Sequence, residues 1–134
     1  MDKKILEAIK KLGDKKLHKK LKEIALKNKP IFIFGKSVWI IKHSLVKSKI
    51  AIRPYGLIFV SDAIPRDLLD IIAVHEKAEE KYAKKFSKRK AHFLASKEEL
   101  KYAKKKKKLK KLLNFLKKKF PRVYSERIKI LKSS

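Results

Sequence analysis

The fold is decided by the segment Leu68–Tyr102, which contains Ile72-Ala-Val-His75-Glu76-Lys-Ala-Glu79 and Ala91-His92-Phe-Leu-Ala95-Ser-Lys-Glu-Glu99. Its apolar residues recur at helical spacing, which predicts a long helix that ends at about Phe86. After a short loop at Ser87-Lys-Arg-Lys, a second helical stretch is expected from Ala91 to Lys119, either continuous or broken. At about 100° per residue, Glu79 falls within roughly 60° of His75 on the apolar stripe of the first helix. A carboxylate on a buried face is costly unless it is paired or binds a metal. We therefore expect these helices to carry a site in which the carboxylate is paired or binds a metal.

The second helix repeats the arrangement, because His92 and Glu99 share one face with three small residues, Ala95, Ser96 and Ala103. Small side chains allow another helix to approach closely. If the two helices face each other, each turns a histidine and a glutamate toward the other. The alternative is that each inward glutamate pairs with one of the many basic residues in a structural ion-pair cluster.

This pattern predicts a metal site with a defined role for each residue. Residues four apart on a helix lie one above the other, so His75 and Glu79 can both reach one ion at about 2.0–2.2 Å. One or both of His92 and Glu99 would complete the shell. Glu76 points about 100° away, where a general base could take a proton from a metal-bound water. Zinc suits such a set of nitrogen and oxygen ligands, and iron or manganese is an alternative.

The charge of the chain offers a second interpretation. Lys and Arg number 40 against 13 Asp and Glu, which gives a net charge of +27. Such a surface favours polyanions, either nucleic acid or acidic membrane lipid, and nucleic acid is the candidate partner. Eight of the 13 acids nonetheless fall between Asp62 and Glu99. The Lys-rich stretch from Lys104 to Phe120 predicts a basic amphipathic helix, whose charged face is either simply solvated or a nucleic-acid groove.

The remaining pattern predicts a single α+β domain. Two helices are expected within residues 3–27, and Asn28-Lys-Pro30 ends the second. Residues 30–61 hold short β-branched or aromatic runs that predict a small, three- to four-stranded, mostly antiparallel sheet. The expected organisation is thus 1–29 helical, 30–61 sheet, 62–120 helices with the site, and 121–134 a tail. The predicted strands are 31–34, 38–41, 49–53 and 57–60, with a turn at Pro54-Tyr-Gly56.

Several classes of protein are excluded or disfavoured. The chain has no cysteine, which rules out disulfides, thiolate metal sites and a cysteine nucleophile. The charged N-terminus and the lack of a long apolar run favour a soluble cytoplasmic protein without a membrane span. Abundant Lys and Ile with few Gly and one Met resemble the composition of thermophile proteins. No phosphate-binding loop or serine-nucleophile motif occurs.

A strand region followed by a His-Glu helix resembles the minimal zincin metallopeptidases, the minigluzincins. The resemblance implies that His75 is a zinc ligand, Glu76 the base and Glu99 the ligand from a following helix. It departs from that family at Glu79, where the family has its second histidine. The pattern His-Glu-x-x-Glu followed by Ala-His-x-x-Ala-x-x-x-Glu, over Ile64–Ala103, is also similar to small uncharacterised phage and archaeal proteins.

These observations favour a metal-dependent hydrolase or peptidase-like protein, active or silent. Its zinc would be bound by His75, Glu79, His92 and Glu99, with Glu76 as the catalytic base, and a peptide or protein would be the substrate. The alternative is a nonenzymatic basic protein that binds nucleic acid, with a structural His/Glu cluster. The sequence does not predict the oligomeric state.

Overall fold

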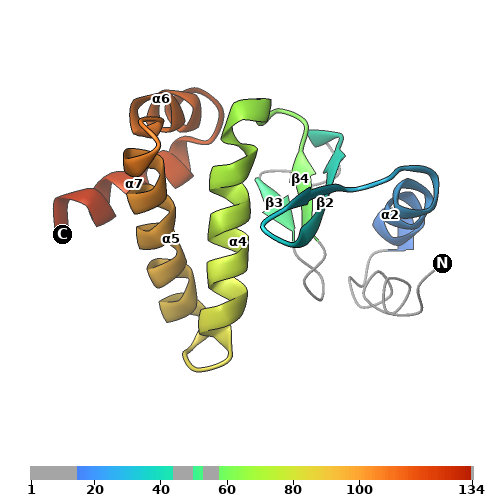
Figure 1. Cartoon of the computed structure of the whole chain (residues 1–134), viewed down its shortest axis with the longest axis horizontal. Coiled ribbons are helices and arrows are strands. Elements are labelled where there is room, and N and C mark those ends of the chain that lie inside the picture. The colour runs from blue at the N-terminus through green and yellow to red at the C-terminus, as the bar shows by residue number, and fades with distance from the viewer. Residues whose placement is uncertain (1–14, 44–49, 53–57, 134) are drawn as a thin grey trace. The chain divides into compact units, whose positions relative to one another are not determined.

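We describe a computed structural model of the chain, covering residues 15–43, 50–52 and 58–133. It has the predicted α+β architecture, with a helix before a small sheet and helices after it (Figure 1). The chain divides into two compact units, Met1–Pro65 and Arg66–Ser134. The segment 68–102 lies wholly in the second unit.

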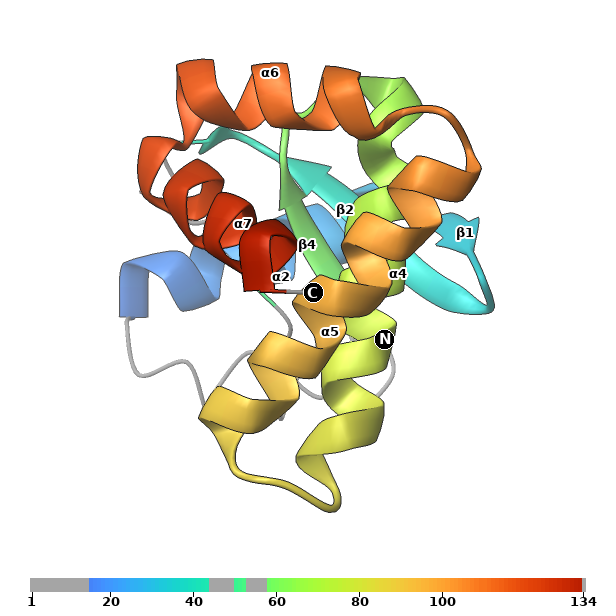
Figure 2. The ribbon, with the colours of Figure 1, turned by 90° about the vertical axis from the view of Figure 1, so that its left-hand side faces the viewer.

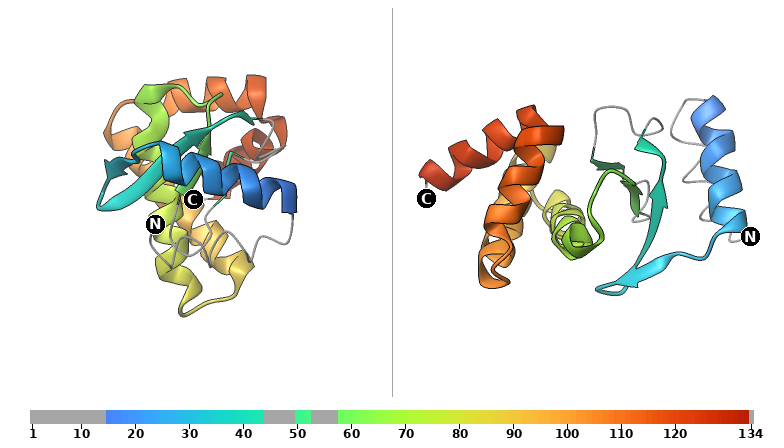
Figure 3. Two further views of the ribbon diagram at one scale, coloured as in Figure 1. Left: turned by 90° about the vertical axis from the view of Figure 1, so that its right-hand side faces the viewer. Right: turned by 90° about the horizontal axis from the view of Figure 1, so that it is seen from above.

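In the first unit, helix α2 (Lys15–Lys27) confirms the second of the two predicted N-terminal helices. It ends just before Asn28-Lys-Pro30, as expected, because Pro30 has no amide hydrogen to continue the helix. The first predicted helix lies outside the described residues. Figure 3 shows α2 along one face of the sheet, where Trp39 Nε1 donates a hydrogen bond to Asn28 O at 3.1 Å.

The sheet contains four strands in the order β1-β2-β4-β3: β1 (Ile31–Ile33), β2 (Lys36–Ile41), β3 (Ala51–Ile52) and β4 (Ile58–Ser61). Two of the three pairings are antiparallel, which confirms a mostly antiparallel sheet, and β2 pairs with β4 in parallel. All four β4 residues are buried. The aromatic rings of Trp39 and Phe59, paired across β2 and β4, stack at 5.2 Å. The predicted turn at Pro54-Tyr-Gly56 lies outside the described residues.

The second unit is helical (Figure 2). It contains a 3₁₀ turn, η2 (Arg66–Leu68), followed by α4 (Leu69–Ala83), α5 (Lys88–Lys105), α6 (Leu109–Lys119) and α7 (Pro121–Ser133). Helices α4 and α5 form the predicted facing pair, and contacts between them are the most extensive between any two elements. The small residues Ala91, Ala95, Ser96 and Ala103 are fully buried, which allows the close approach.

The structure fixes two helix boundaries. Helix α4 ends at Ala83 instead of the predicted end at about Phe86, because the chain turns there and the Ser87 hydroxyl caps α5 by accepting from Lys90 N at 3.2 Å. The predicted helical stretch 91–119 takes its broken form: α5 and α6 are separate helices, and Lys107 between them adopts a positive φ of 61°. Lys107 N donates to Lys104 O and Lys108 N to Ala103 O, the Schellman pattern of a helix end.

The break at Lys107 brings α6 and α7 back against the helical pair. Side chains at the start of α4 fix this return: Tyr102 Oη donates to Asp70 Oδ2 at 2.7 Å, and Lys108 Nζ donates to Asp67 O at 2.6 Å. Residues 121–133, part of the predicted tail 121–134, form α7, which begins with Pro121 at its first position. Among the described residues, no helix is both long and apolar enough to cross a membrane.

Candidate metal centre

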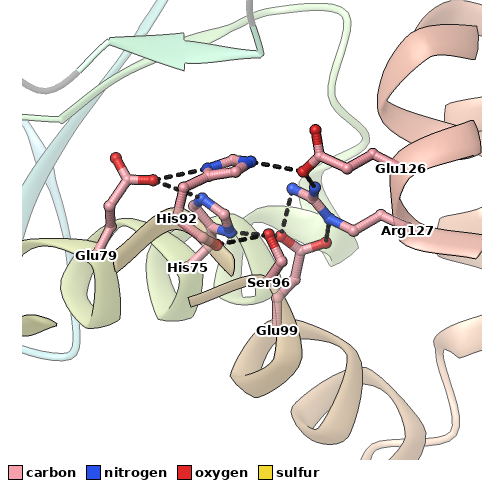
Figure 4. Close-up of polar contacts among 7 residues, drawn as sticks. All are labelled: His75, Glu79, His92, Ser96, Glu99, Glu126 and Arg127. Carbon is pink, nitrogen blue, oxygen red and sulfur yellow. Dashed lines mark hydrogen bonds and ion pairs between the residues drawn. The ribbon is translucent and has the colours of Figure 1, made fainter. Parts of the chain in front are cut away.

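Three side chains from α4 and α5 converge on one point (Figure 4). His75 Nε2 lies 3.2 Å from Glu79 Oε2, as the i,i+4 spacing on α4 predicts, and His92 Nδ1 from α5 lies 2.8 Å from the same oxygen. The three donor atoms lie within 4.8 Å of one another. A tetrahedral zinc with ligands at about 2.1 Å separates its ligand atoms by about 3.4 Å. An ion at this point would therefore require the distance from His92 Nδ1 to Glu79 Oε2 to lengthen by about 0.6 Å.

Each histidine has a second carboxylate beside its other ring nitrogen. His75 Nδ1 lies 2.8 Å from Glu99 Oε1, an ion-pair distance without the geometry of a good hydrogen bond. His92 Nε2 lies 2.6 Å from Glu126 Oε1. Histidines that bind metals usually donate their other N–H to a carboxylate, carbonyl or water, which fixes the tautomer and aims the free nitrogen at the ion. His92 therefore has the hydrogen-bonded surroundings of a metal ligand, and His75 has a carboxylate at ion-pair distance from its other nitrogen.

Glu99 is held by an arginine as well as by His75. Arg127 Nε donates to Glu99 Oε2 at 2.9 Å and Arg127 Nη2 to Glu99 Oε1 at 3.1 Å, which makes a forked pair. Both side chains are buried, with 5% and 2% of their surfaces exposed. Arg127 Nη1 also donates to Glu126 at 2.7 Å. Glu99 thus lies behind His75, whereas Glu79 lies between the two rings.

The pKa values of the site follow from these contacts. Burial alone would lower the pKa of His75, but bonding to Glu79 and the nearby Glu99 raise it to about 9. The bond from His92 Nδ1 to Glu79 raises the pKa of His92 as well. The two histidines lower the pKa of Glu79. Burial would raise the pKa of Glu99, yet Arg127 and His75 lower it to about 2. Without an ion, the site is therefore a set of charged groups.

The charges of this set balance. Protonated His75, protonated His92 and Arg127 carry three positive charges. The carboxylates of Glu79, Glu99 and Glu126 carry three negative ones. Both imidazole nitrogens that face Glu79 share one oxygen, so each needs a proton there. A divalent cation that replaced these two protons would leave the total charge unchanged.

The structure brings together three of the predicted ligands, His75, Glu79 and His92, as a group able to hold a metal ion. The fourth, Glu99, contacts His75 and Arg127, and it is not among the three donors that converge. Glu76, the predicted base, follows His75 on α4, is partly buried, and its charge contributes to the raised pKa of His75. Its role stays a prediction.

Sequence reasoning missed Glu126 and Arg127, both on α7. One signal for Glu126 exists in the sequence, because it is the single acidic residue in positions 100–134. Arg127 has no comparable signal, since it is one of 40 Lys and Arg residues. Their placement depends on α7 packing against α5, which no local pattern specifies.

Comparisons with protein-family models, with curated proteins and with solved structures found no match for this chain. The resemblances to minigluzincins and to small phage and archaeal proteins therefore remain predictions. The functional argument rests on the site alone.

Proposed function

We propose that this protein binds a divalent transition-metal ion, zinc in the first instance, through His75 Nε2, Glu79 Oε2 and His92 Nδ1. The observation that carries the proposal is the double carboxylate–histidine arrangement. Both rings aim one nitrogen at the shared point and keep the other beside a second carboxylate, Glu99 or Glu126. Two imidazoles and one carboxylate form a ligand set used by zinc and also by non-haem iron(II).

The competing explanation is a structural ion-pair cluster with no metal. It accounts for the charge balance equally well, because protonated histidines pair with the same carboxylates. It gives no reason, however, for two histidines to direct their nitrogens at one oxygen atom, since a protonated ring pairs as well with separate carboxylates. A shared ion supplies that reason.

We further propose that the bound metal serves hydrolysis. Three protein ligands leave a fourth zinc position open for water, which is the arrangement of catalytic zinc sites, whereas structural sites are closed. His92 and Glu79 leave 40% and 19% of their side-chain surfaces exposed, so solvent reaches the site from their side. A metal-bound water has a pKa near 7, and Glu76 would take its proton. A peptide or protein is the substrate class that the zincin resemblance suggests.

Metal binding is tested by competition against a chromophoric chelator. Protein stripped of metal is titrated with zinc, iron(II) and manganese(II), beside the variants His75→Ala and Glu79→Gln. The variant Glu80→Gln is the matched control, because it removes one carboxylate from the adjacent position of α4. We expect one equivalent of tightly bound zinc in the wild type and in Glu80→Gln, and much weaker binding in the other two. Wild-type binding no tighter than that of His75→Ala would refute the proposal.

Hydrolysis is tested separately with the zinc-loaded protein and a fluorogenic peptide library. Glu76→Gln should retain zinc and lose about 10²- to 10⁴-fold in kcat, the usual contribution of a general base. Glu80→Gln again provides the control. Activity that survives in Glu76→Gln would show that Glu76 is not the general base. Tight zinc binding by a wild-type protein that cleaves no peptide would refute hydrolysis and leave the metal site standing.

A further inference from the structure

The turn between α4 and α5 forms a strongly cationic surface, which we call the hairpin tip and define as residues 81–90. Its ten residues include six cations, Lys81, Lys84, Lys85, Lys88, Arg89 and Lys90, and no acid. All six cations are exposed. Within the part of the chain that the structure describes, Lys84, Lys85, Lys88 and Arg89 make no ion pair. In Figures 1 and 2 the tip lies at the end of the α4–α5 pair opposite α6.

Aromatic rings lie among these cations. Phe86, within the tip, and Phe93, one turn beyond it on α5, are 38% and 41% exposed. Lys90 Nζ lies 4.4 Å from the centre of the Phe86 ring, and Lys97 Nζ lies 5.6 Å from that of Phe93. Exposed rings bordered by cations are the elements with which proteins hold single-stranded nucleic acid.

We propose that the hairpin tip binds single-stranded nucleic acid. The phosphates would pair with Lys84, Lys85, Lys88 and Arg89, and bases would stack on Phe86 and Phe93. The binding goes beyond the proposed metal function and does not depend on it, because among the described residues no hydrogen bond or ion pair joins these side chains to the three metal donors. Charge complementarity and the exposed rings favour this partner.

The same surface fits two other polyanions less well. An acidic membrane is usually bound by a continuous apolar helix face, whereas Phe86 and Phe93 are single apolar side chains bordered by cations. Double-stranded DNA offers phosphates to the cations but no free base faces to the rings. Single-stranded nucleic acid offers phosphates to the cations and base faces to the rings.

The test measures fluorescence anisotropy of a labelled oligo-dT of about 16 nucleotides, titrated with the full-length, metal-free protein at several salt concentrations. In the tip variant, Lys84, Lys85, Lys88 and Arg89 are replaced by Gln. The matched control replaces four exposed lysines elsewhere in the same unit: Lys105, Lys110, Lys118 and Lys119. Both variants lower the net charge by four, so any difference between them reports position and not total charge.

We expect the tip variant to bind at least about tenfold more weakly than the control at moderate salt. Losing four phosphate contacts should also reduce the slope of log affinity against log salt by about 3. Equal weakening of both variants would overturn the proposal, because the binding would then follow the overall charge of +27 alone.

The rings are tested by the double variant Phe86→Leu/Phe93→Leu, which keeps apolar side chains but removes the stacking surface. Oligonucleotide affinity should fall at least about fivefold, and Phe86→Tyr/Phe93→Tyr should restore it. Unchanged affinity in the leucine variant would contradict stacking. Vesicles of phosphatidylcholine and phosphatidylserine test the rival partner, an acidic membrane. If the leucine variant loses binding to vesicles but keeps its affinity for the oligonucleotide, the proposal is overturned in favour of a membrane.

Discussion

Glu79 and Glu99 are two inward-facing carboxylates of one site, and their surroundings differ. Glu79 lies between two histidine nitrogens and is 19% exposed, whereas Glu99 is 2% exposed and held by a forked arginine. The pKa of each carboxylate is lowered, but the causes differ. At Glu79 the two histidines lower the pKa. At Glu99 burial would raise the pKa, and Arg127 and His75 together outweigh that effect. An ion could replace the protons that Glu79 faces, whereas Arg127 cannot lose its proton. The difference separates a carboxylate suited to bind metal from one suited to hold a ligand in place.

The largest expected effect is on stability. Glu99→Gln leaves Arg127 buried without its main counter-charge, so it should lower the free energy of unfolding by about 3–5 kcal/mol. Glu79→Gln should cost less, because Glu79 is partly solvated. Urea denaturation of the metal-free proteins measures both, with Glu98→Gln, at the adjacent position, as the control. A Glu99→Gln variant no less stable than Glu79→Gln would remove the contrast between the two carboxylates.

The next effect is the pH dependence of the metal-free protein, because His75 interacts with both carboxylates. The pKa of His75 is raised from 6.5 to about 9 on folding, so its contribution is full below pH 6.5 and is lost as pH rises through about 9. The loss should be at most about 3 kcal/mol. The measurement is the difference between wild type and His75→Gln from pH 6 to 10, which cancels the titration of the lysines. A difference that stays constant over this window would show that the histidine is not held protonated.

A third effect concerns metal affinity. Glu79→Gln removes a ligand, so zinc affinity should fall by more than the 10- to 100-fold typical of residues behind the ligands. Calorimetric titration gives the zinc affinity. Repeating it in buffers of different ionisation enthalpy gives the number of protons released on binding. We expect release of up to two protons on zinc binding to the wild type at pH 7, because the pKa values of His75 and His92 are raised. Zinc binding without proton release would mean that the ion binds elsewhere.

The smallest effect is expected at Glu126, which lies behind His92. Glu126→Gln should weaken zinc binding about tenfold, because the amide still accepts a hydrogen bond but no longer stabilises the ring electrostatically. The free energy of unfolding of this variant should change little, since the Glu126 side chain is 46% exposed. A loss of affinity as large as that of Glu79→Gln would make Glu126 a ligand and would require a different arrangement of the site.

Helical spacing was sufficient to predict half of this site. The apolar stripe of α4 placed His75 and Glu79 inward, and the small residues of α5 predicted that a second helix with His92 would face them. The sheet followed from short β-branched and aromatic runs, although the parallel pairing of β2 with β4 could not be derived from them. The role of Glu99 could not be predicted, because it depends on which of many basic side chains reaches it. That choice is made by the packing of α7, a property of the tertiary fold.

The most direct test is X-ray absorption spectroscopy at the zinc edge of the zinc-loaded wild-type protein. The site described here predicts four light-atom ligands at about 2.0–2.1 Å, with the outer-shell scattering of two imidazole rings. That imidazole scattering should decrease in His92→Ala. A zinc ion with six oxygen ligands and no imidazole scattering would contradict the site, and the His/Glu cluster would then be structural.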